Sequence, residues 1–339
     1  MSIRNTVKGI GLLACAASLT AQGAVAETFV ATSSVPPTHW LNTQGMEPLM
    51  DCIRERSEGE IDFDFFPAGQ IASTAGALDA VTGGLAQLGM IATSANSDRL
   101  PLNQITMLPD MGDTAPDIVA AYRKVMAQDG PLARELAAAN VLPLTVIYLP
   151  PYQIGLKGPA LNAIGDFDGL KVRVAGGGQV FGIQALDGVP VQISSGDAYV
   201  AMQQGTVDGF LLSLTSVVSY SLQEVSSAIS TNGNFANAQT FLGMDQRVFD
   251  SFTPERQAIY LECGKQTEDS MSAYLENLAN ELKTDFAAQG VEMFEFTPEL
   301  WAEVAAKMQP VATDYIERMN ALGLPGQEAY DEYRKALGK

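Results

Sequence analysis

The fold is decided by the run Leu142-Pro143-Leu144-Thr145-Val146-Ile147-Tyr148-Leu149, which is followed directly by Pro150-Pro151. A continuous apolar run of this length is typical of a strand with both faces covered, as in a parallel sheet between layers of helices. Proline has no backbone N–H, so the double proline ends the run. We expect one α/β unit to end here and a second to begin after it.

Strands and helices alternate on both sides of the double proline. Before it, the apolar patterns predict strands at 28–32, 61–65, 88–92 and 142–149 and helices at 39–57, 73–82 and 117–139. After it, they predict strands at 153–157, 170–174, 189–193 and 207–212, helices from 179 and over 197–204, and two helical pieces within 298–337. This alternation indicates an α/β fold with mainly parallel sheets.

The pattern over 253–289 predicts a helix of unusual length. It would run about 55 Å, longer than either unit is wide, so we expect it to span two lobes. The expected division is 27–150 plus 238–281 for lobe I and 151–237 plus 282–339 for lobe II. A hinge is expected where the lobes join, near Pro150-Pro151 and Thr231 to Ala238. Two α/β lobes around a hinge are typical of a protein that closes on a small ligand.

Charge and composition exclude several classes of function. The 339 residues include 20 Lys plus Arg against 39 Asp plus Glu, a net charge of -19, which repels nucleic acid. One histidine and three cysteines are too few for a zinc site or a relay of histidines. We expect neither a metal nor a cofactor.

The N-terminus resembles an export signal. Residues 1–26 combine the positive Arg4 and Lys8, a short apolar stretch and a small-x-small cleavage site at Ala24-Val25-Ala26. Lipidation at Cys15 is the alternative, although its apolar stretch is short for export. Cleavage after Ala26 would remove two positive charges and leave 18 against 39, or -21.

The exported chain would keep two cysteines, Cys52 and Cys263. In an oxidising compartment an even pair is more often bridged than free, so we predict a disulfide. Two separately buried thiols remain the alternative.

Arg173 is the first candidate for ligand binding. It lies in Asp168-Gly169-Leu170-Lys171-Val172-Arg173-Val174, a predicted strand, and is followed by Gly176-Gly177-Gly178. A guanidinium group suits bidentate capture of a carboxylate, whereas the alternative is an ordinary surface ion pair. The three glycines lack the spacing of a phosphate loop and predict a flexible turn. His39, Trp40 and Tyr152 follow proline-rich turns, where they could bind ligand or simply pack.

The chain resembles a known family in three motifs. They are Pro67-Ala68-Gly69-Gln70, the Arg173 strand, and Tyr199-Val200-Ala201-Met202-Gln203-Gln204-Gly205-Thr206-Val207-Asp208-Gly209. In this order they are similar to the solute-binding subunits of tripartite ATP-independent periplasmic (TRAP) transporters, the dicarboxylate-binding-protein family. The resemblance covers nearly the whole exported chain.

The resemblance implies a two-lobed periplasmic binding protein with a long helix across both lobes. It also implies delivery of ligand to a small and a large integral membrane subunit for sodium-driven uptake. Arg173 would bind the ligand carboxylate.

Two departures from the family pattern narrow the expected ligand. Phe210-Leu211-Leu212-Ser213 stands where many members have a polar segment, and Tyr152-Gln153 stands where many have a second arginine. We therefore expect a monocarboxylate with an apolar or aromatic body. The residues expected around it are the aromatic Trp40, Tyr152 and Phe210, the neutral donors Gln70, Gln153 and Gln179, and also His39 and Asp208.

Two other functions remain open from the sequence. The same receptor could dock onto a membrane histidine kinase as a sensor. A secreted enzyme acting on small acids could use His39 as a general base with Asp208 as its partner, although no nucleophile motif accompanies them.

Overall fold

The structure is a computed structural model that describes residues 26–109, 111, 112 and 114–338. The expected signal segment, apart from Ala26, and the alternative lipidation site at Cys15 lie outside the described residues. Within the described residues, no helix is both long and apolar enough to cross a bilayer.

The first sheet has the strand order β2-β1-β3-β10-β4. Its strands are β1 (Glu27–Thr32), β2 (Ile61–Phe66), β3 (Leu88–Ala92), β4 (Val141–Tyr148) and β10 (Gln239–Asp245). β1 pairs in parallel with β2 and β3, but β10 is antiparallel to both β3 and β4. The expectation of a mainly parallel sheet is wrong here, because β10 enters this lobe from the other one and runs back along β4.

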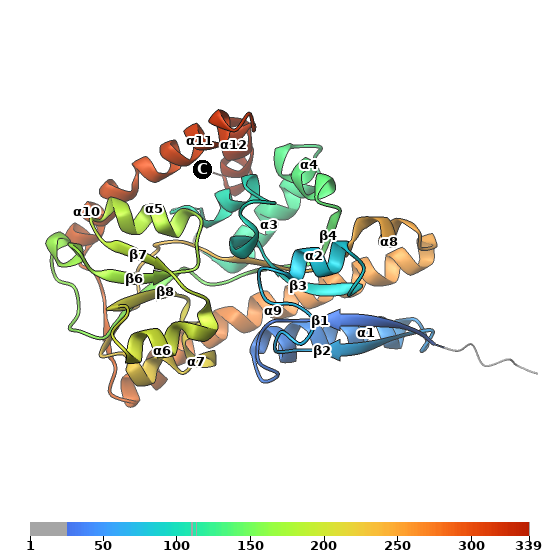
Figure 1. The fold of residues 1–339 in the computed structure, drawn as a ribbon, viewed down its shortest axis with the longest axis horizontal. Coiled ribbons are helices and arrows are strands. Elements are labelled where there is room, and N and C mark those ends of the chain that lie inside the picture. Colours follow the sequence, from blue (N-terminus) through green and yellow to red (C-terminus); the bar gives the residue numbers. More distant parts are fainter. Residues whose placement is uncertain (1–25, 110, 113, 339) are drawn as a thin grey trace, which may run out of the picture.

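The second sheet has the strand order β11-β9-β5-β8-β6-β7. Its strands are β5 (Gln153–Leu156), β6 (Lys171–Val174), β7 (Val189–Gln192), β8 (Gly209–Leu212), β9 (Ala228–Ser230) and β11 (Glu292–Phe294). β6 is parallel to β7 and β8, whereas β5 is antiparallel to β8 and β9. The two sheets lie in separate lobes (Figure 1). The chain therefore has the two-lobed α/β fold expected from the sequence.

Helices cover both sheets. The helices that precede β10 are α1 (Glu47–Arg56), α2 (Ala77–Thr82), α3 (Ala115–Met126), α4 (Pro131–Ala138), α5 (Gly178–Ala185), α6 (Ala198–Gln203) and α7 (Leu214–Ser219). The helices that follow β10 are α8 (Gln246–Asp250), α9 (Pro254–Ala288), α10 (Pro298–Met308), α11 (Pro310–Ala321) and α12 (Gly326–Leu337). Short 3-10 and π segments join some of them, including the π segment Asn42–Met46 and the 3-10 segment Leu102–Met107.

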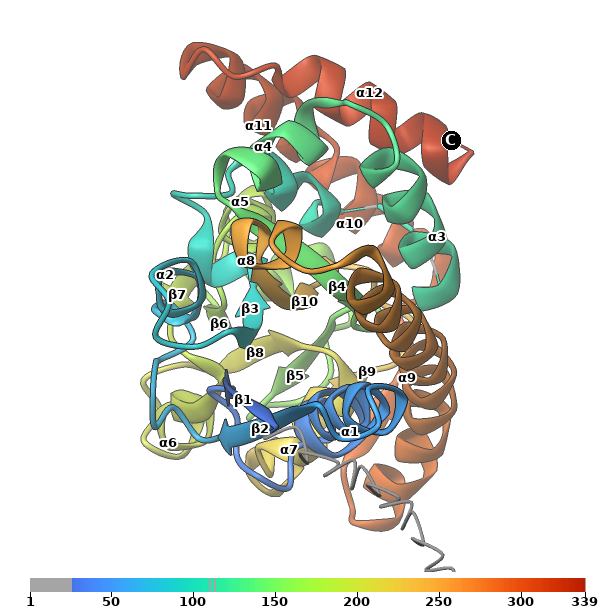
Figure 2. The same cartoon turned by 90° about the vertical axis from the view of Figure 1, so that its right-hand side faces the viewer.

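The long helix α9 has 35 residues and begins after Thr253, whose side chain accepts a hydrogen bond from the backbone N–H of Arg256. It contacts α1, α3 and β4 of the first lobe and α7 and β11 of the second. Figure 2 shows it running along one side of the molecule past both sheets. The prediction of a helix that spans both lobes is confirmed.

Proline divides two segments that we expected to be more continuous. The segment 117–139 forms α3 and α4, which are separated at Gly130-Pro131. The C-terminal segment forms three helices instead of two, because Pro310 starts α11 directly after α10. Proline has no N–H for the helix interior but fits the first turn, so in both places it starts a new helix. The last helix, α12, packs against α3 and α4.

The predicted disulfide is present. Cys52 of α1 and Cys263 of α9 are bridged, with their Cα atoms 5.7 Å apart. Cys263 is fully buried, so the bridge ties the long helix to the edge of the first lobe.

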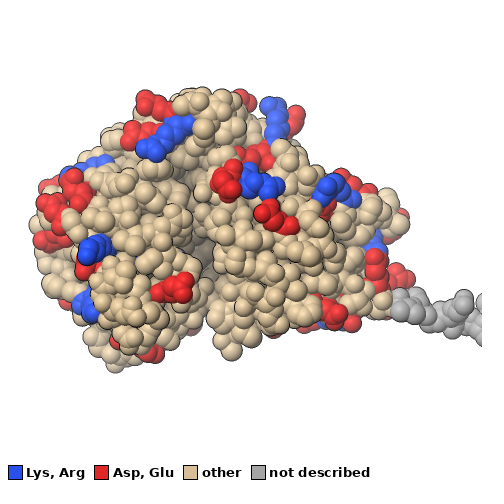
Figure 3. All heavy atoms as spheres, in the orientation of Figure 1, with Lys and Arg blue, Asp and Glu red and all other residues tan. Residues whose placement is uncertain are grey.

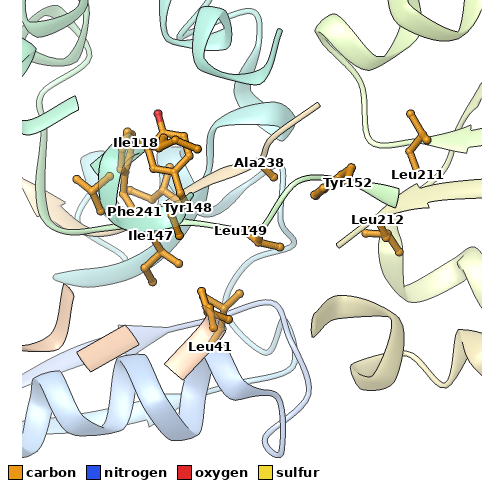
Figure 4. Packing of buried hydrophobic residues seen from close by; sticks show 14 of the residues in the cluster. Leu41, Ile118, Ile147, Tyr148, Leu149, Tyr152, Leu211, Leu212, Ala238 and Phe241 are labelled. Carbon is orange, nitrogen blue, oxygen red and sulfur yellow. The ribbon is translucent and has the colours of Figure 1, made fainter. Parts of the chain in front are cut away.

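Two crossover segments connect the lobes and bond to each other. The Leu149 N–H donates to the Ala238 carbonyl at 3.0 Å, and the Tyr152 N–H donates to the Ala236 carbonyl at 2.8 Å. Figure 4 shows Leu149, Tyr152 and Ala238 between the core residues of the two lobes. All three are buried, so apolar packing is continuous through the crossovers.

Candidate ligand-binding site

Arg173 lies on β6 of the second sheet, between the edge strand β7 and β8. The register pairs it with Val191 of β7 and Phe210 of β8, and paired residues project from the same face of a sheet. Its side chain lies across the strand ends: Nε donates to the Ile193 carbonyl at 2.7 Å and an Nη to the Leu211 carbonyl at 3.3 Å. The guanidinium therefore sits at the carboxyl ends of parallel strands, where α/β sheets bind ligands.

The Arg173 side chain is buried without an acidic partner. It is 1% exposed, and its third hydrogen bond goes to the Ser195 hydroxyl at 2.9 Å. Among the described residues, no Asp or Glu forms an ion pair with it. Burial lowers the pKa of Arg173, while the nearby Tyr152 and Tyr220 act in the opposite direction. A buried cation held by neutral groups alone favours an incoming anion.

Two tyrosines flank the guanidinium. Tyr152 comes from the first crossover segment and is buried, and Tyr220 follows α7 and is half-buried. Burial raises the pKa of each to about 12, although the charge of Arg173 opposes the rise. Both phenols therefore stay neutral at ordinary pH, and a neutral phenol can still donate a hydrogen bond.

His39 and Trp40 reach this site from the first lobe. The Trp40 Nε1–H donates to the Thr215 carbonyl in α7 at 3.1 Å, and the His39 ring lies 5.5 Å from the Tyr220 ring. Both contacts cross between the lobes. His39 Nδ1 accepts a hydrogen bond from the Leu41 N–H, and burial lowers the pKa of His39 to about 4. The imidazole is therefore neutral, and the site has walls from both lobes.

The surface view agrees with this position between the lobes. Figure 3 shows a groove separating the two halves of the molecule, with mostly uncharged residues on either side of it. Charged side chains gather on the outer surfaces instead. An anion in this groove would therefore meet few charged side chains before it reaches the buried Arg173.

The glycine triplet forms part of the contact between the lobes. A Cβ on Gly177 would lie 2.9 Å from Met107 Cε, and a Cβ on Gly178 would lie 2.9 Å from Leu108 Cδ2. Both neighbours belong to the first lobe, at the end of the 3-10 segment Leu102–Met107. The sequence predicted only a flexible turn at Gly176-Gly177-Gly178, whereas here the turn is a close inter-lobe approach that lacks room for side chains.

Other predicted site residues have structural partners. The Gln153 amide bonds to both the N–H and the carbonyl of Gly233 and so ties the crossovers together. Asp208 is exposed and accepts from the Lys171 N–H at 2.9 Å, at the opposite end of β6 from the guanidinium of Arg173. Among the described residues, no ion pair or hydrogen bond joins Asp208 to His39.

Three predicted residues differ in their position. Phe210 shares the sheet face of Arg173, but its ring fills the space over Gly155. Gln179 is fully buried; its Oε1 accepts from the Ala175 N–H, and its Nε2 has no partner among the described residues. Gln70 lies exposed on a turn. The structure thus links Arg173, Tyr152, His39 and Trp40 through Tyr220 and Thr215, whereas Asp208 bonds at the other end of β6.

Sequence reasoning missed Tyr220, Thr215 and Ser195. Ser195 follows β7, and the rule that ligands bind beyond the carboxyl ends of parallel strands could have identified it. Tyr220 and Thr215 belong to the α7 segment, where the apolar pattern marks no surface as special. Only the approach of the other lobe distinguishes them.

Comparison with known proteins gives a family match over most of the chain. Residues 32–318 match the model of the family described as bacterial extracellular solute-binding protein, family 7. The chain is similar to the outer membrane transporter protein TsaT of Comamonas testosteroni, at 24% identity over 310 residues, covering 91% of this chain and 90% of that protein.

Solved structures show the same fold. A TRAP periplasmic solute-binding protein from Bordetella bronchiseptica with bound (R)- and (S)-mandelate is 20% identical, with a TM-score of 0.81 over 92% of this chain and 99% of that one. A TRAP solute-binding protein from Rhodoferax ferrireducens with copurified benzoate is 19% identical, with a TM-score of 0.84 over 92% and 98% of the two chains.

Proposed function

Since the chain belongs to bacterial extracellular solute-binding protein family 7, we propose that it captures a small organic acid with one carboxylate and an apolar or aromatic body. The observation that carries the proposal is the buried Arg173, which has no acidic partner among the described residues. A ligand carboxylate would supply the missing charge and use the N–H groups that the protein leaves free.

The surroundings of Arg173 support an aromatic or apolar body. Tyr152 and Tyr220 lie near the cation, and the His39 ring next to Tyr220 is followed by the Trp40 ring. The described residues place no second arginine or lysine in these contacts. A second carboxylate would therefore be buried without a cation, which is costly. The bound mandelate and benzoate of the two structural neighbours are monocarboxylates on an aromatic ring.

Capture proceeds by closure of the two lobes around the acid. Arg173, Tyr152 and Tyr220 would bind from the second lobe and the crossover, and His39 and Trp40 would complete the wall from the first. A ligand that touches both lobes binds the closed form better than the open one, so it shifts the population towards closure. The crossover segments 149–152 and 231–238, which bond to each other, are the proposed hinge.

The closed receptor would deliver its ligand to the membrane subunits of a TRAP transporter. We propose export through cleavage of residues 1–26, which fits a disulfide in an oxidising compartment. The division into lobe I (27–150 and 238–281) and lobe II (151–237 and 282–339) stays a proposal, with α12 lying against α3 of the first sheet's lobe.

We propose that the acid is bound without being transformed. His39 is a poor general base because burial lowers its pKa to about 4. An enzyme with His39 as its general base would need Asp208 as the partner of His39. Asp208 instead accepts a hydrogen bond from the backbone N–H of Lys171.

Calorimetric titration of the exported chain with benzoate, mandelate and succinate tests the proposal. We expect benzoate or mandelate to bind and succinate to bind at least tenfold more weakly. Arg173→Ala should weaken the monocarboxylate at least 30-fold, since removing one partner of a buried charge pair costs about 2 kcal/mol or more. Arg99→Ala is the matched control, because Arg99 pairs with Asp79 on the surface.

Tight binding of succinate without benzoate or mandelate would keep the receptor and overturn the ligand class. Unchanged binding by Arg173→Ala, with circular dichroism showing an intact fold, would overturn the role of Arg173.

A further inference from the structure

A second cavity lies on the other side of the hinge from the ligand site. Its volume is about 690 Å³, within the range of small-molecule sites. Both crossover segments line it, through Pro150-Pro151 and 231–234, together with α9, α10 and α12. None of the rings around Arg173 lines it, so it is separate from the cleft between the lobes.

Two cations face this cavity in a strongly acidic protein. Lys283 of α9 is half-buried and forms no ion pair among the described residues. Arg334 of α12 also lines the cavity, with its guanidinium 5.9 Å from the Tyr330 ring. Glu276 also lines the cavity, but it lies two helical turns before Lys283, about 10 Å away along α9. The end of the cavity near Lys283 therefore favours an anion.

The other residues that line the cavity favour a planar ligand that carries a hydrogen-bond donor. Asn234 of the second crossover donates to the Gly112 carbonyl at 3.4 Å, while its buried Oδ1 has no donor among the described residues. Trp301 of α10 lines the cavity and is fixed by edge contact with Phe235 at 5.4 Å. Fixed rings such as Trp301 bind planar ligands at little entropic cost.

We propose that this cavity is a second binding site, for an aromatic organic anion that also carries an N–H or O–H donor. The anion pairs with Lys283, the ring lies against Trp301 and Tyr330, and the donor bonds to Asn234 Oδ1. The two crossovers in its wall couple the site to the cleft: closing one side of a hinge opens the other, so an occupant here stabilises the closed form. This coupling rests on the proposed function, whereas binding at the cavity does not.

The positions of the two tryptophans allow each site to be observed separately. The chain has 2 Trp; Trp40 is in the cleft and Trp301 in the hinge cavity. Labelling with 5-fluorotryptophan gives one ¹⁹F resonance for each site, assigned with Trp40→Phe and Trp301→Phe. Indole-3-acetate is the probe, because it combines a carboxylate, a planar ring and an N–H.

We expect indole-3-acetate to shift the Trp301 resonance saturably. Lys283→Gln should weaken this binding at least tenfold, and Lys124→Gln, the same change at an exposed lysine of α3, should leave it within twofold. Naphthalene-1-acetate, which has a similar ring and carboxylate but no donor, should bind at least fivefold more weakly. Indole-3-acetate also belongs to the class of acids proposed for the cleft, so Arg173→Ala, which removes the carboxylate partner in the cleft, should keep a saturable shift of the Trp301 resonance.

The proposal is overturned if the Trp301 resonance does not move, if only the Trp40 resonance moves, or if Lys283→Gln binds equally well. Failure of the proposed cleft function has a different signature. In that case benzoate leaves the Trp40 resonance unchanged while the response of Trp301 to indole-3-acetate persists.

Discussion

At the scale of single residues, burial decides which side chains of the cleft carry a charge, and this sets the specificity for an anion. Arg173 keeps its charge in a site where Tyr152 and Tyr220 stay neutral, because burial raises both tyrosine pKa values to about 12. His39 is also neutral. Burial disfavours the charged form of a side chain, which for a base such as His39 lowers the pKa, here to about 4. Arg173 is therefore the charged group of this set at neutral pH.

The buried His39 predicts that ligand affinity falls in acid. In the open form its ring would be solvated with an ordinary pKa near 6.5, whereas in the closed form the pKa is about 4. Closure then requires His39 to lose its proton. Above pH 6.5 His39 is already neutral and closure has no added cost, whereas closure becomes less favourable as the pH falls from 6.5 towards 4. We expect the Kd for benzoate to rise about tenfold between pH 7 and pH 5.5, measured by calorimetry.

The control is His39→Asn, whose side-chain oxygen can accept the Leu41 N–H that His39 Nδ1 accepts now. This variant should bind with a nearly constant Kd over the same range, because Arg173, Tyr152 and Tyr220 do not titrate there. A similar pH slope in both proteins would show that another group controls closure.

At the scale of elements, prolines and one disulfide define the helical framework. Pro131 and Pro310 start new helices inside segments that the apolar pattern alone reads as more continuous. The bridge between Cys52 and Cys263 then fastens α1 to α9 across a sequence separation of 211 residues. The long helix is thus anchored in one lobe and can carry contacts from the other.

Removing the disulfide should lower stability without changing ligand affinity. Cys52→Ala with Cys263→Ala should reduce the free energy of unfolding by about 2–4 kcal/mol, because the bridge restricts the unfolded chain. Urea unfolding measures the loss, and benzoate titration provides the comparison. A large change in Kd would mean that the anchored end of α9 also controls the cleft.

At the scale of the whole molecule, the two lobes approach closely at one place, where glycines of the second lobe face larger side chains of the first. The second lobe places Gly177 and Gly178 against Met107 and Leu108 of the first. Leu108 is fully buried, so it has little freedom to move aside. The hinge crossovers allow the lobes to rotate, and this contact limits how closely they can approach.

Gly178→Ala should therefore impair closure while leaving the fold intact. Gly178 is the first residue of α5, where alanine is a better helix former than glycine, yet its Cβ would lie 2.9 Å from Leu108 Cδ2. We expect at least a fivefold increase in the Kd for benzoate and a larger radius of gyration with ligand, by small-angle scattering. Gly182→Ala in the same helix is the control, because its nearest neighbour, Met308 Sδ, would be 3.9 Å away. Equal effects of both variants would place the cause in α5 and not in the inter-lobe contact.

The sequence by itself determined the two α/β units, the long helix, the disulfide and the strand that carries Arg173. These follow from local patterns: apolar periodicity, proline and glycine positions, and cysteine number are properties of neighbouring residues along the chain. Reasoning from motifs also brought Tyr152, His39 and Trp40 into consideration, because they follow proline-rich turns.

Only the tertiary structure decided which of these candidates lie together. Tyr220 lies beside His39 because the two lobes approach, and Asp208 is removed from the site because its carboxylate caps the start of β6. The antiparallel β10 and the hinge cavity likewise depend on how the chain crosses twice between lobes. Contacts between segments more than a hundred residues apart leave no periodic trace in either segment, so packing alone establishes them.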